Sequence, residues 1–210
     1  MSMDRRETAP WLDWAVELQA LAQAGLYYSD NPFELERYAR IREIAAEMLA
    51  HQSGFPLEKV TDIFCCETGY QTPKLDTRAA IFRDGRILLV RERDGRWSLP
   101  GGWVDVNCSV GENVVKEVRE EAGLDVRAEL VIAVQDRERH NLPVYAYKVC
   151  KIFVLCSLLG GAFQENAETT ASGWFALDEL PELAAEKNNR EQIELCFRAC
   201  QAEQWKTVLE

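Results

Sequence analysis

The sequence predicts a layered α/β fold with a mixed sheet, preceded by a small helical domain. Over the first 50 residues, apolar side chains recur every three or four positions, as in amphipathic helices. After Val60 the apolar segments become short and strand-like, and Asp84-Gly85 and Asp94-Gly95 have the composition of tight hairpin turns. Strands with a few helices between them are typical of a sheet that is covered by helices.

Two helices are expected near the N-terminus. The first runs from Trp11 to about Ala24, and Gly25 is expected to end it. The residues Ser29-Asp30-Asn31-Pro32 predict the start of the second helix, which continues to about Ala50. Two short helices bury little apolar surface alone. We therefore expect them to pack on the rest of the chain or on a second copy of it.

The remainder of the chain is predicted to be mainly strands. The expected strands are Ile63–Cys66, Arg78–Phe82, Arg86–Arg91, Trp97–Leu99, Val126–Gln135, Tyr147–Ser157 and Trp174–Phe175. Residues 136–140 are expected to form a charged loop and residues 178–183 a helical turn, and an amphipathic helix over residues 189–204 closes the chain. We place the boundary between the helical extension and the α/β domain so that they span residues 1–72 and 73–210.

Another helix is expected after the glycine turn Pro100-Gly101-Gly102-Trp103, and it carries a cluster of glutamates. Glu117, Glu120 and Glu121 are three or four positions apart, which makes them neighbours on a helix surface. Such like charges repel each other, and Mg²⁺ or Mn²⁺ between them would remove the repulsion. A solvated acidic face is the alternative. The glycine turn upstream and Gly123 at the helix end favour the cation site.

The segment from Gly102 to Leu124 resembles the Nudix box, whose pattern is Gly, five residues, Glu, seven residues, Arg-Glu-apolar-x-Glu-Glu-x-Gly-apolar. Two positions depart from the pattern. Cys108 replaces the first glutamate, and Lys116 replaces the arginine, which keeps the charge but loses the planar fork of donors. Further stretches, at residues 11–15, 67–74 and 189–195, resemble a Nudix subgroup with an N-terminal helical extension that is similar to ADP-ribose and CDP-choline pyrophosphatases.

The resemblance implies a Nudix-type α/β/α sandwich and metal-dependent hydrolysis of the pyrophosphate bond of a nucleoside diphosphate derivative. It implies that Glu117, Glu120, Glu121 and the carbonyl of Gly101 bind Mg²⁺ or Mn²⁺. It also implies a homodimer with the helical extension at the interface. Hydrolysis of oxidised nucleoside triphosphates and a non-catalytic nucleotide sensor are the alternatives, and the residues do not separate ADP-ribose from CDP-choline.

The resemblance further implies a catalytic base in the polar loop of residues 160–170. Glu168 is the first candidate and Glu165 the second, and both would act beside Glu121. Substrate contacts are expected from aromatic and basic side chains that could stack on a base or bind phosphate. The candidates are Tyr70, Arg78, Arg91, Trp103 and His140. For each of them the alternative is a surface ion pair, a linker anchor or ordinary packing.

Composition narrows the classes of protein further. The chain has 35 acidic and 24 basic residues, a net charge of −11, and this argues against a nucleic-acid surface. We expect no membrane segment, because the longest apolar stretch is too short to span a bilayer, and no signal peptide. The seven cysteines are expected to be reduced thiols of a cytoplasmic protein. Their spacing is not that of a zinc site.

Overall fold

In the computed structural model, which describes residues 10–143, 145 and 147–210, the chain divides into two compact units. The helical unit contains residues 10–73 together with Tyr145 and Tyr147. The α/β unit contains residues 74–143 and 148–210. All seven cysteines lie in the described residues and are free thiols. No helix among the described residues is long and apolar enough to cross a membrane.

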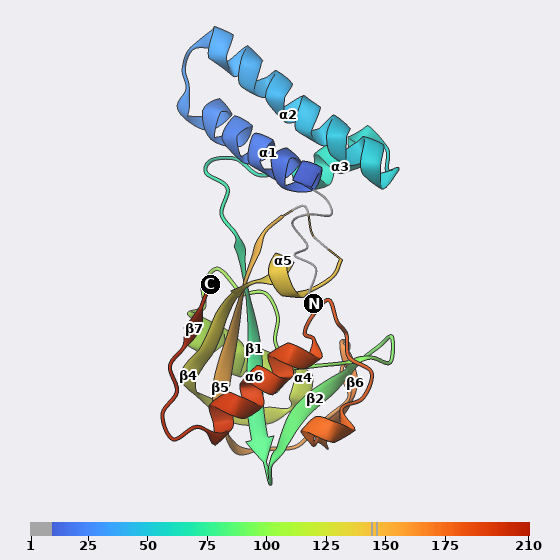
Figure 1. The fold of residues 1–210 in the computed structure, drawn as a ribbon, viewed down its shortest axis with the longest axis vertical. Helices are drawn as coiled ribbons and strands as arrows, with labels where there is room; N and C mark the ends of the chain where they lie inside the picture. Colours follow the sequence, from blue (N-terminus) through green and yellow to red (C-terminus); the bar gives the residue numbers. More distant parts are fainter. Residues whose placement is uncertain (1–9, 144, 146) are drawn as a thin grey trace. The chain divides into compact units, whose positions relative to one another are not determined.

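The helical unit contains three helices, α1 (Pro10–Tyr28), α2 (Pro32–Ser53) and α3 (Leu57–Phe64), which are labelled in Figure 1. The α2 helix begins as predicted, because the Asn31 side chain caps it by accepting the N–H of Phe33. It ends at Gly54, which adopts the left-handed conformation. The core of the helical unit is small and consists of Ala15, Val16, Ala45, Ala46, Leu49, Val60, Phe64 and Cys65.

Gly25 does not end the first helix, as the sequence suggested, but lies inside α1. A Cβ atom at this position would lie 2.5 Å from three ring carbons of Tyr38 on α2. The missing side chain therefore allows the two helices to approach closely where the Tyr38 ring lies against the α1 backbone. Close packing between helices, and not helix termination, explains this glycine.

The predicted strand Ile63–Cys66 is wrong, because α3 includes Ile63 and Phe64 and the next two residues follow the helix. A run of four apolar residues has no period that separates a strand from a buried helix. In α3, Val60 and Phe64 are four residues apart and both are buried in the core of the helical unit. Contacts with the other helices decide the conformation here.

The α/β unit is built on a seven-stranded mixed sheet with the order β3-β2-β1-β5-β4-β7, while β6 pairs with β2. β1 is parallel to β5 and β4 to β7, whereas the other pairs are antiparallel. The predicted mixed sheet is thus confirmed. The strands are β1 (Lys74–Arg83), β2 (Arg86–Glu92), β3 (Trp97–Ser98), β4 (Leu124–Asp136), β5 (Val149–Gly161), β6 (Thr169–Phe175) and β7 (Val208–Leu209).

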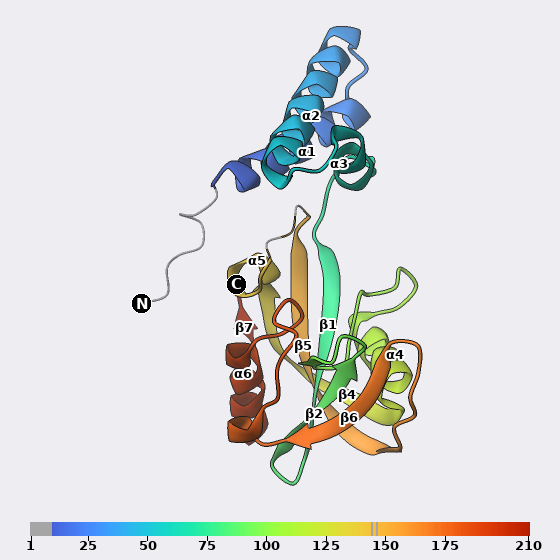
Figure 2. The same ribbon diagram turned by 90° about the vertical axis from the view of Figure 1, so that its right-hand side faces the viewer.

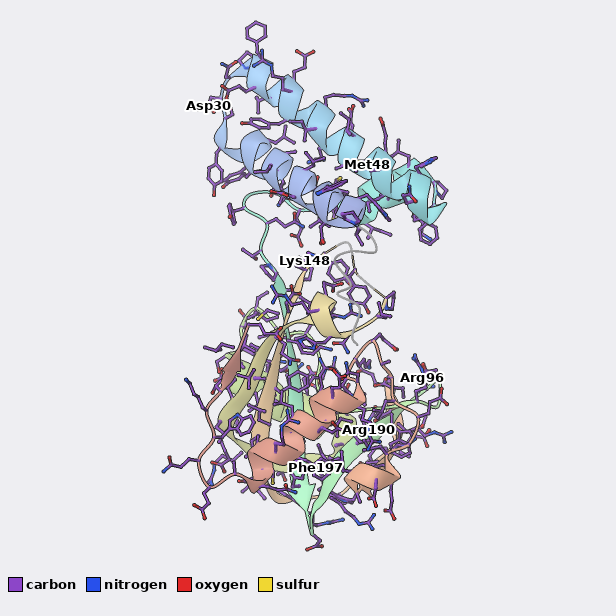
Figure 3. All side chains as sticks on the ribbon, viewed as in Figure 1. Asp30, Met48, Arg96, Lys148, Arg190 and Phe197 are labelled. Atoms are coloured by element: carbon purple, nitrogen blue, oxygen red, sulfur yellow. The ribbon has the colours of Figure 1, made fainter. Side chains whose placement is uncertain are left out.

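Helices cover both faces of the sheet, as Figure 2 shows with α4 (Val110–Ala122) on one side and α6 (Arg190–Gln201) on the other. Alternate residues of β1 point to opposite faces: Ala79 and Ile81 pack with α4, and Ala80 packs with α6. On α6, Phe197, labelled in Figure 3, meets the ring of Phe82 edge-on. The layered α/β architecture is therefore confirmed.

Three short elements differ from the sequence predictions. The expected charged loop at residues 136–140 contains a short helix, α5 (Arg137–His140), which the Asp136 side chain caps. The expected helical turn is a 3₁₀-helix, η2 (Leu177–Glu179). The closing helix ends at Gln201, and the strand β7 after it was not predicted, since two residues carry no detectable period.

Candidate active site

The candidate active site is built around α4, whose two ends are both capped. Ser109 and Glu112 form a reciprocal capping box at its start. Gly123 ends it in the left-handed conformation and donates its N–H to the carbonyl of Arg119. One side of the helix is fully buried against the sheet, at Val114, Val118 and Ala122. This packing fixes the direction in which the glutamates point.

The glycine turn at Gly101–Gly102 lies on β1 and faces the middle and the end of α4. Thr77 donates its N–H to the carbonyl of Gly102 at 2.9 Å. Gly101 has φ +140°, and a Cβ there would lie 2.0 Å from the carbonyl oxygen of Thr77. The N–H of Gly101 donates to Oε2 of Glu121 at 2.9 Å. A side chain at position 101 would clash with β1, so only glycine lets the turn lie against this strand while its N–H reaches Glu121.

Glu121 is buried, with 4% of its surface exposed. Burial raises the pKa of its carboxyl to about 7, and this effect outweighs the opposing influence of Arg78 and of the Gly101 N–H. The carboxyl therefore changes charge near neutral pH. A carboxyl whose pKa is raised this far by burial is characteristic of functional sites.

Arg78 lies in the middle of β1 and is buried. Its guanidinium pairs with both oxygens of Asp76, with Nε–Oδ2 and Nη2–Oδ1 distances of 3.1 and 2.8 Å, and it donates to the carbonyl of Leu99. This geometry gives no support to the predicted phosphate contact, because Asp76 holds the fork. The positive charge of Arg78 instead lowers the pKa of Glu121.

Glu117 lies one turn before Glu121, with 12% of its side chain exposed. A Cβ on Gly102 would lie 2.8 Å from its Oε2, so the turn also packs against this carboxylate. Burial raises the pKa of Glu117, Lys116 opposes the shift, and the negative charges of Glu120 and Glu168 add to it. The two glycines of the turn thus meet two of the three predicted glutamates.

The Lys116 ammonium is the centre of an acidic cluster. Its Nζ lies 3.1 Å from Oδ2 of Asp105, 3.2 Å from Oε1 of Glu117 and 3.2 Å from Oε2 of Glu120. The three carboxylates raise the pKa of Lys116, so it stays charged. Lys116 and Glu120 also line an open depression of about 470 Å³ on the outer face of α4. This part of the site already holds one cation among three carboxylates.

The donor set fits a hard divalent cation in chemistry and in the sign of its charge, since it offers carboxylate oxygens around a position that holds an ammonium. No group of three His, Cys, Asp or Glu side chains among residues 10–143, 145 and 147–210 is arranged to enclose a metal ion by itself. Glu121 accepts from Gly101, while Glu117 and Glu120 pair with Lys116.

The loop that carries Glu168 is tied to the C-terminal end of α4. Asn166 donates from Nδ2 to the carbonyl of Glu120 at 2.9 Å, and Thr169 donates from Oγ1 to the carbonyl of Glu121 at 2.6 Å. Glu168 is exposed, and its charge contributes to the raised pKa of Glu117. Glu165 is exposed in the same loop. Of the two base candidates, only Glu168 shows an interaction with the α4 carboxylates in the described structure.

The other predicted substrate residues are dispersed. Trp103 is 47% exposed and its backbone pairs with Asp76. Arg91 is exposed near the end of β2 and donates to the carbonyl of Gly95. His140, on α5, lies 2.7 Å from a carboxylate oxygen of Glu210. Tyr70 belongs to the helical unit and is 73% exposed. Their roles in binding substrate stay predictions.

Sequence reasoning did not identify Asp105 and Asn166. Asp105 lies only three residues before Cys108, and its carbonyl accepts the N–H of Cys108 in a turn. An acidic residue three positions before Cys108, where the box lacks its glutamate, was a signal from which Asp105 could have been identified. Asn166 lies two residues before Glu168, the spacing at which an asparagine side chain binds the following backbone.

Comparison with known families gives matches to both parts of the chain. Residues 73–196 match the NUDIX domain, and residues 9–64 match a family described as the UDP-X-like, N-terminal oligomerisation domain. A protein of Bacillus subtilis (strain 168), named provisionally as an ADP-ribose pyrophosphatase, is 40% identical over 201 residues. That alignment covers 95% of this chain and 97% of the relative.

Two solved structures are similar to this chain with a TM-score of 0.63 each. An ADP-ribose pyrophosphatase from Streptococcus suis 89-1591 is 57% identical, and the match covers 66% of this chain and 100% of that one. A UDP-X diphosphatase is 35% identical, and the match covers 96% of this chain and 98% of that one. These likenesses confirm the predicted sandwich fold and the predicted resemblance along nearly the whole chain.

Proposed function

We propose, because this chain belongs to the Nudix family of hydrolases, that it cleaves the pyrophosphate bond of a nucleoside diphosphate linked to a second group. The observation that carries the proposal is the contact of the Gly101–Gly102 turn with Glu117 and Glu121 of α4, inside the matched domain. A turn of this kind beside a row of carboxylates suits a substrate that brings phosphates and needs their charge neutralised.

Glu117, Glu120 and Glu121 are the residues that would hold Mg²⁺ or Mn²⁺, with the carbonyl of Gly101 as a further ligand. The support is chemical: both cations take carboxylate and carbonyl oxygens. The ammonium of Lys116 already lies between Glu117 and Glu120. When bound, such an ion neutralises charge on the phosphates and makes a bound water more acidic.

Glu168 is the general base of the proposed reaction, and Glu165 is the second candidate. A base must reach its water directly or through one intermediary. Glu168 is exposed to solvent and electrostatically coupled to Glu117, and both properties support this role. Glu121 would contribute as an acidic group of the same site. Its carboxyl, with a pKa of about 7, is ionised once a cation compensates for its burial.

The substrate class follows from the relatives. The Bacillus subtilis relative and the Streptococcus suis structure carry the name of an ADP-ribose pyrophosphatase, and the structure with full coverage carries that of a UDP-X diphosphatase. ADP-ribose is therefore our first candidate, with UDP-linked groups next and CDP-choline as the remaining alternative. Arg91, Trp103, His140 and Tyr70 are the proposed contacts for base or phosphate.

The proposed partner is a second copy of the chain, bound through the helical unit. The matched N-terminal family is described as an oligomerisation domain. The helices of this unit, and the turn between α2 and α3, expose large apolar side chains that a dimer would cover. Those with more than half of their surface exposed include Trp14, Leu21, Tyr27, Tyr28, Phe33, Phe55 and Ile63.

Because the net charge of the chain is −11, we do not propose a nucleic-acid partner. A cytoplasmic location is proposed from the free thiols.

The test is a hydrolysis screen of the full-length protein with Mg²⁺ and with Mn²⁺. The substrates are ADP-ribose, a UDP-sugar, CDP-choline, NADH and oxidised and ordinary nucleoside triphosphates, and the products are identified by chromatography. We expect metal-dependent turnover fastest on a diphosphate-linked substrate, with ADP-ribose giving AMP and ribose 5-phosphate. Turnover of none of them would refute the proposal, and preference for an oxidised triphosphate would favour the alternative named above.

A further inference from the structure

The last turn of α4 has backbone carbonyls that no helical N–H can reach. The final four carbonyls of any helix lack such partners. Here the carbonyl of Glu120 accepts from Nδ2 of Asn166 at 2.9 Å, and the carbonyl of Glu121 accepts from Oγ1 of Thr169 at 2.6 Å. Asn166, in the loop before β6, and Thr169, the first residue of β6, thus complete the end of the helix that carries the glutamates.

The same Asn166 side chain also holds the backbone around Glu168. Its Oδ1 accepts from the N–H of Glu168 and from the N–H of Thr169, each at 2.9 Å. Its Nδ2 donates to Oγ1 of Thr169 at 2.8 Å in addition to Glu120. One amide therefore uses its acceptor on the loop and its donors on the helix end and on Thr169. Few side chains other than asparagine offer both functions at this length.

Arg93, in the turn after β2, holds the other side of this loop. Its Nε donates to the carbonyl of Ala167, and its Nη2 donates to the carbonyl of Asn166 at 3.3 Å. The backbone on both sides of Glu168 is thereby fixed, whereas the Glu168 side chain stays exposed to solvent. An ordered backbone under an accessible carboxylate is what a positioned base requires.

We infer that Asn166 is a positioning residue for Glu168, because its amide joins the backbone N–H of Glu168 to the last turn of α4. This inference rests on the proposed function, in which Glu168 is the base. Asn166 itself does not touch substrate. It sets the separation between the Glu168 carboxylate and the glutamates of α4, and misplacement of a reacting group by about 1 Å can cost about a hundredfold in rate.

The experiment is a double-mutant cycle of N166A and E168Q on the full-length protein, with kcat and KM measured on the best substrate of the screen. Loss of a general base lowers kcat by roughly 10²- to 10⁴-fold. We expect N166A to lower kcat by roughly 10- to 100-fold with little change in KM. In the E168Q background, N166A should change kcat by less than about twofold, because the base it positions is already absent.

Three comparisons separate positioning from a purely structural role. N166S keeps a short acceptor for the loop N–H groups, so it should retain more of kcat than N166A. N31A removes an equivalent asparagine cap on α2 and should lower thermal stability without lowering kcat. Hydrogen exchange of the Glu168 and Thr169 amides should be faster in N166A than in the wild type, whether or not substrate is present.

The outcomes are distinct. A wild-type protein that hydrolyses no substrate refutes the proposed function. An active wild type whose N166A variant keeps full kcat refutes this inference alone. The inference also fails if N166A lowers kcat by the same factor in both backgrounds, or if E168Q leaves kcat unchanged.

Discussion

The backbone N–H of Gly101 donates to the carboxylate of Glu121 at 2.9 Å, and this contact joins the glycine turn to the glutamate helix. Replacement of Glu121 by Gln keeps an acceptor for the Gly101 N–H but removes the charge that a cation needs. We therefore expect E121Q to fold normally and to lose more than about a hundredfold in kcat/KM. The kcat/KM of ADP-ribose hydrolysis in the presence of Mn²⁺ would measure this loss. E191Q, on α6, is the matched control, and full activity in E121Q would refute the metal assignment.

The same carboxyl should make stability depend on pH in the metal-free protein. Burial raises the pKa of Glu121 to about 7, so between about pH 4.5 and pH 7 the folded state binds more protons than the unfolded state. The free energy of unfolding should therefore fall by about 3 kcal/mol over this window. E121Q lacks the titrating group, so it should gain stability relative to the wild type as pH rises. Urea unfolding of both proteins at pH 5 and pH 8 in EDTA would test this. If the difference in free energy of unfolding between E121Q and the wild type were the same at both pH values, the prediction would be contradicted.

Lys151 should have the opposite effect on the pH dependence of the free energy of unfolding. It is 1% exposed, and burial, with a further contribution from Arg78, lowers its pKa to about 7, although Asp76 opposes the shift. Between pH 7 and its ordinary pKa of 10.5 the folded state binds fewer protons than the unfolded state, so stability should rise with pH. Replacement by Met should remove this rise. Unfolding of K151M and the wild type at pH 7 and pH 9.5 would measure it, and parallel curves would contradict it.

The Lys116 ammonium pairs with Asp105 as well as with Glu117 and Glu120, so Asp105 weakens its interaction with the two glutamates. In D105N the ammonium is shared by these two glutamates alone, so it should compete more strongly with a metal ion. We expect Mn²⁺ affinity, measured by electron paramagnetic resonance, to fall roughly two- to fivefold, as suits a partly exposed pair. D94N makes the same change of charge in the β2–β3 turn and should leave Mn²⁺ affinity unchanged.

A second variant tests whether Asp105 compensates for the glutamate that the box lacks at Cys108. In the D105N background, C108E restores a carboxylate on the same turn before α4 and should recover the lost Mn²⁺ affinity. In the wild-type background C108E should change it little, because Lys116 already has three carboxylate partners. A large gain in the wild-type background would show that Asp105 is not a substitute.

Gly25 should not tolerate a side chain, although it lies within a helix. Alanine normally stabilises a helix interior by about 1 kcal/mol relative to glycine. At Gly25 the added methyl group would lie 2.5 Å from the Tyr38 ring, so we expect net destabilisation of roughly 1–3 kcal/mol. G111A on α4 is the matched control, because nothing lies within 4 Å of its Cβ and it should be neutral or stabilising. Thermal unfolding of both variants decides the matter.

The features that could be predicted from the sequence depend on local pattern. The residues Ser29-Asp30-Asn31-Pro32 correctly predicted the start of α2, which the Asn31 side chain caps. Gly123 was correctly predicted to end α4. Asp84-Gly85 correctly marked the turn between β1 and β2, where both residues have positive φ. Period and turn chemistry act over a few residues, so they can be found without knowledge of the fold.

The features that could not be predicted depend on contacts between distant segments. The sequence placed Glu121 in a cluster on the helix surface, but the turn at Gly101, 20 residues earlier, contacts its carboxylate, and Glu121 is buried. Asn166 binds the carbonyl of Glu120, which lies 46 residues earlier on α4, so no local pattern links the two residues. Gly25 resembled a helix end because its partner, Tyr38, is on the next helix. Each depends on which side chains the fold brings together.

The parallel pairing of β1 with β5 also bears on how the chain folds as it is synthesised. Ala79 pairs with Val154, so a central strand made early must wait for about 75 further residues before its neighbour exists. The contacts of α1 with α2 are local and can form first. Until β5 emerges, the open edge of β1 is a place where two unfinished chains could pair with each other. Growth at lower temperature, which slows such association, should therefore raise the yield of folded protein.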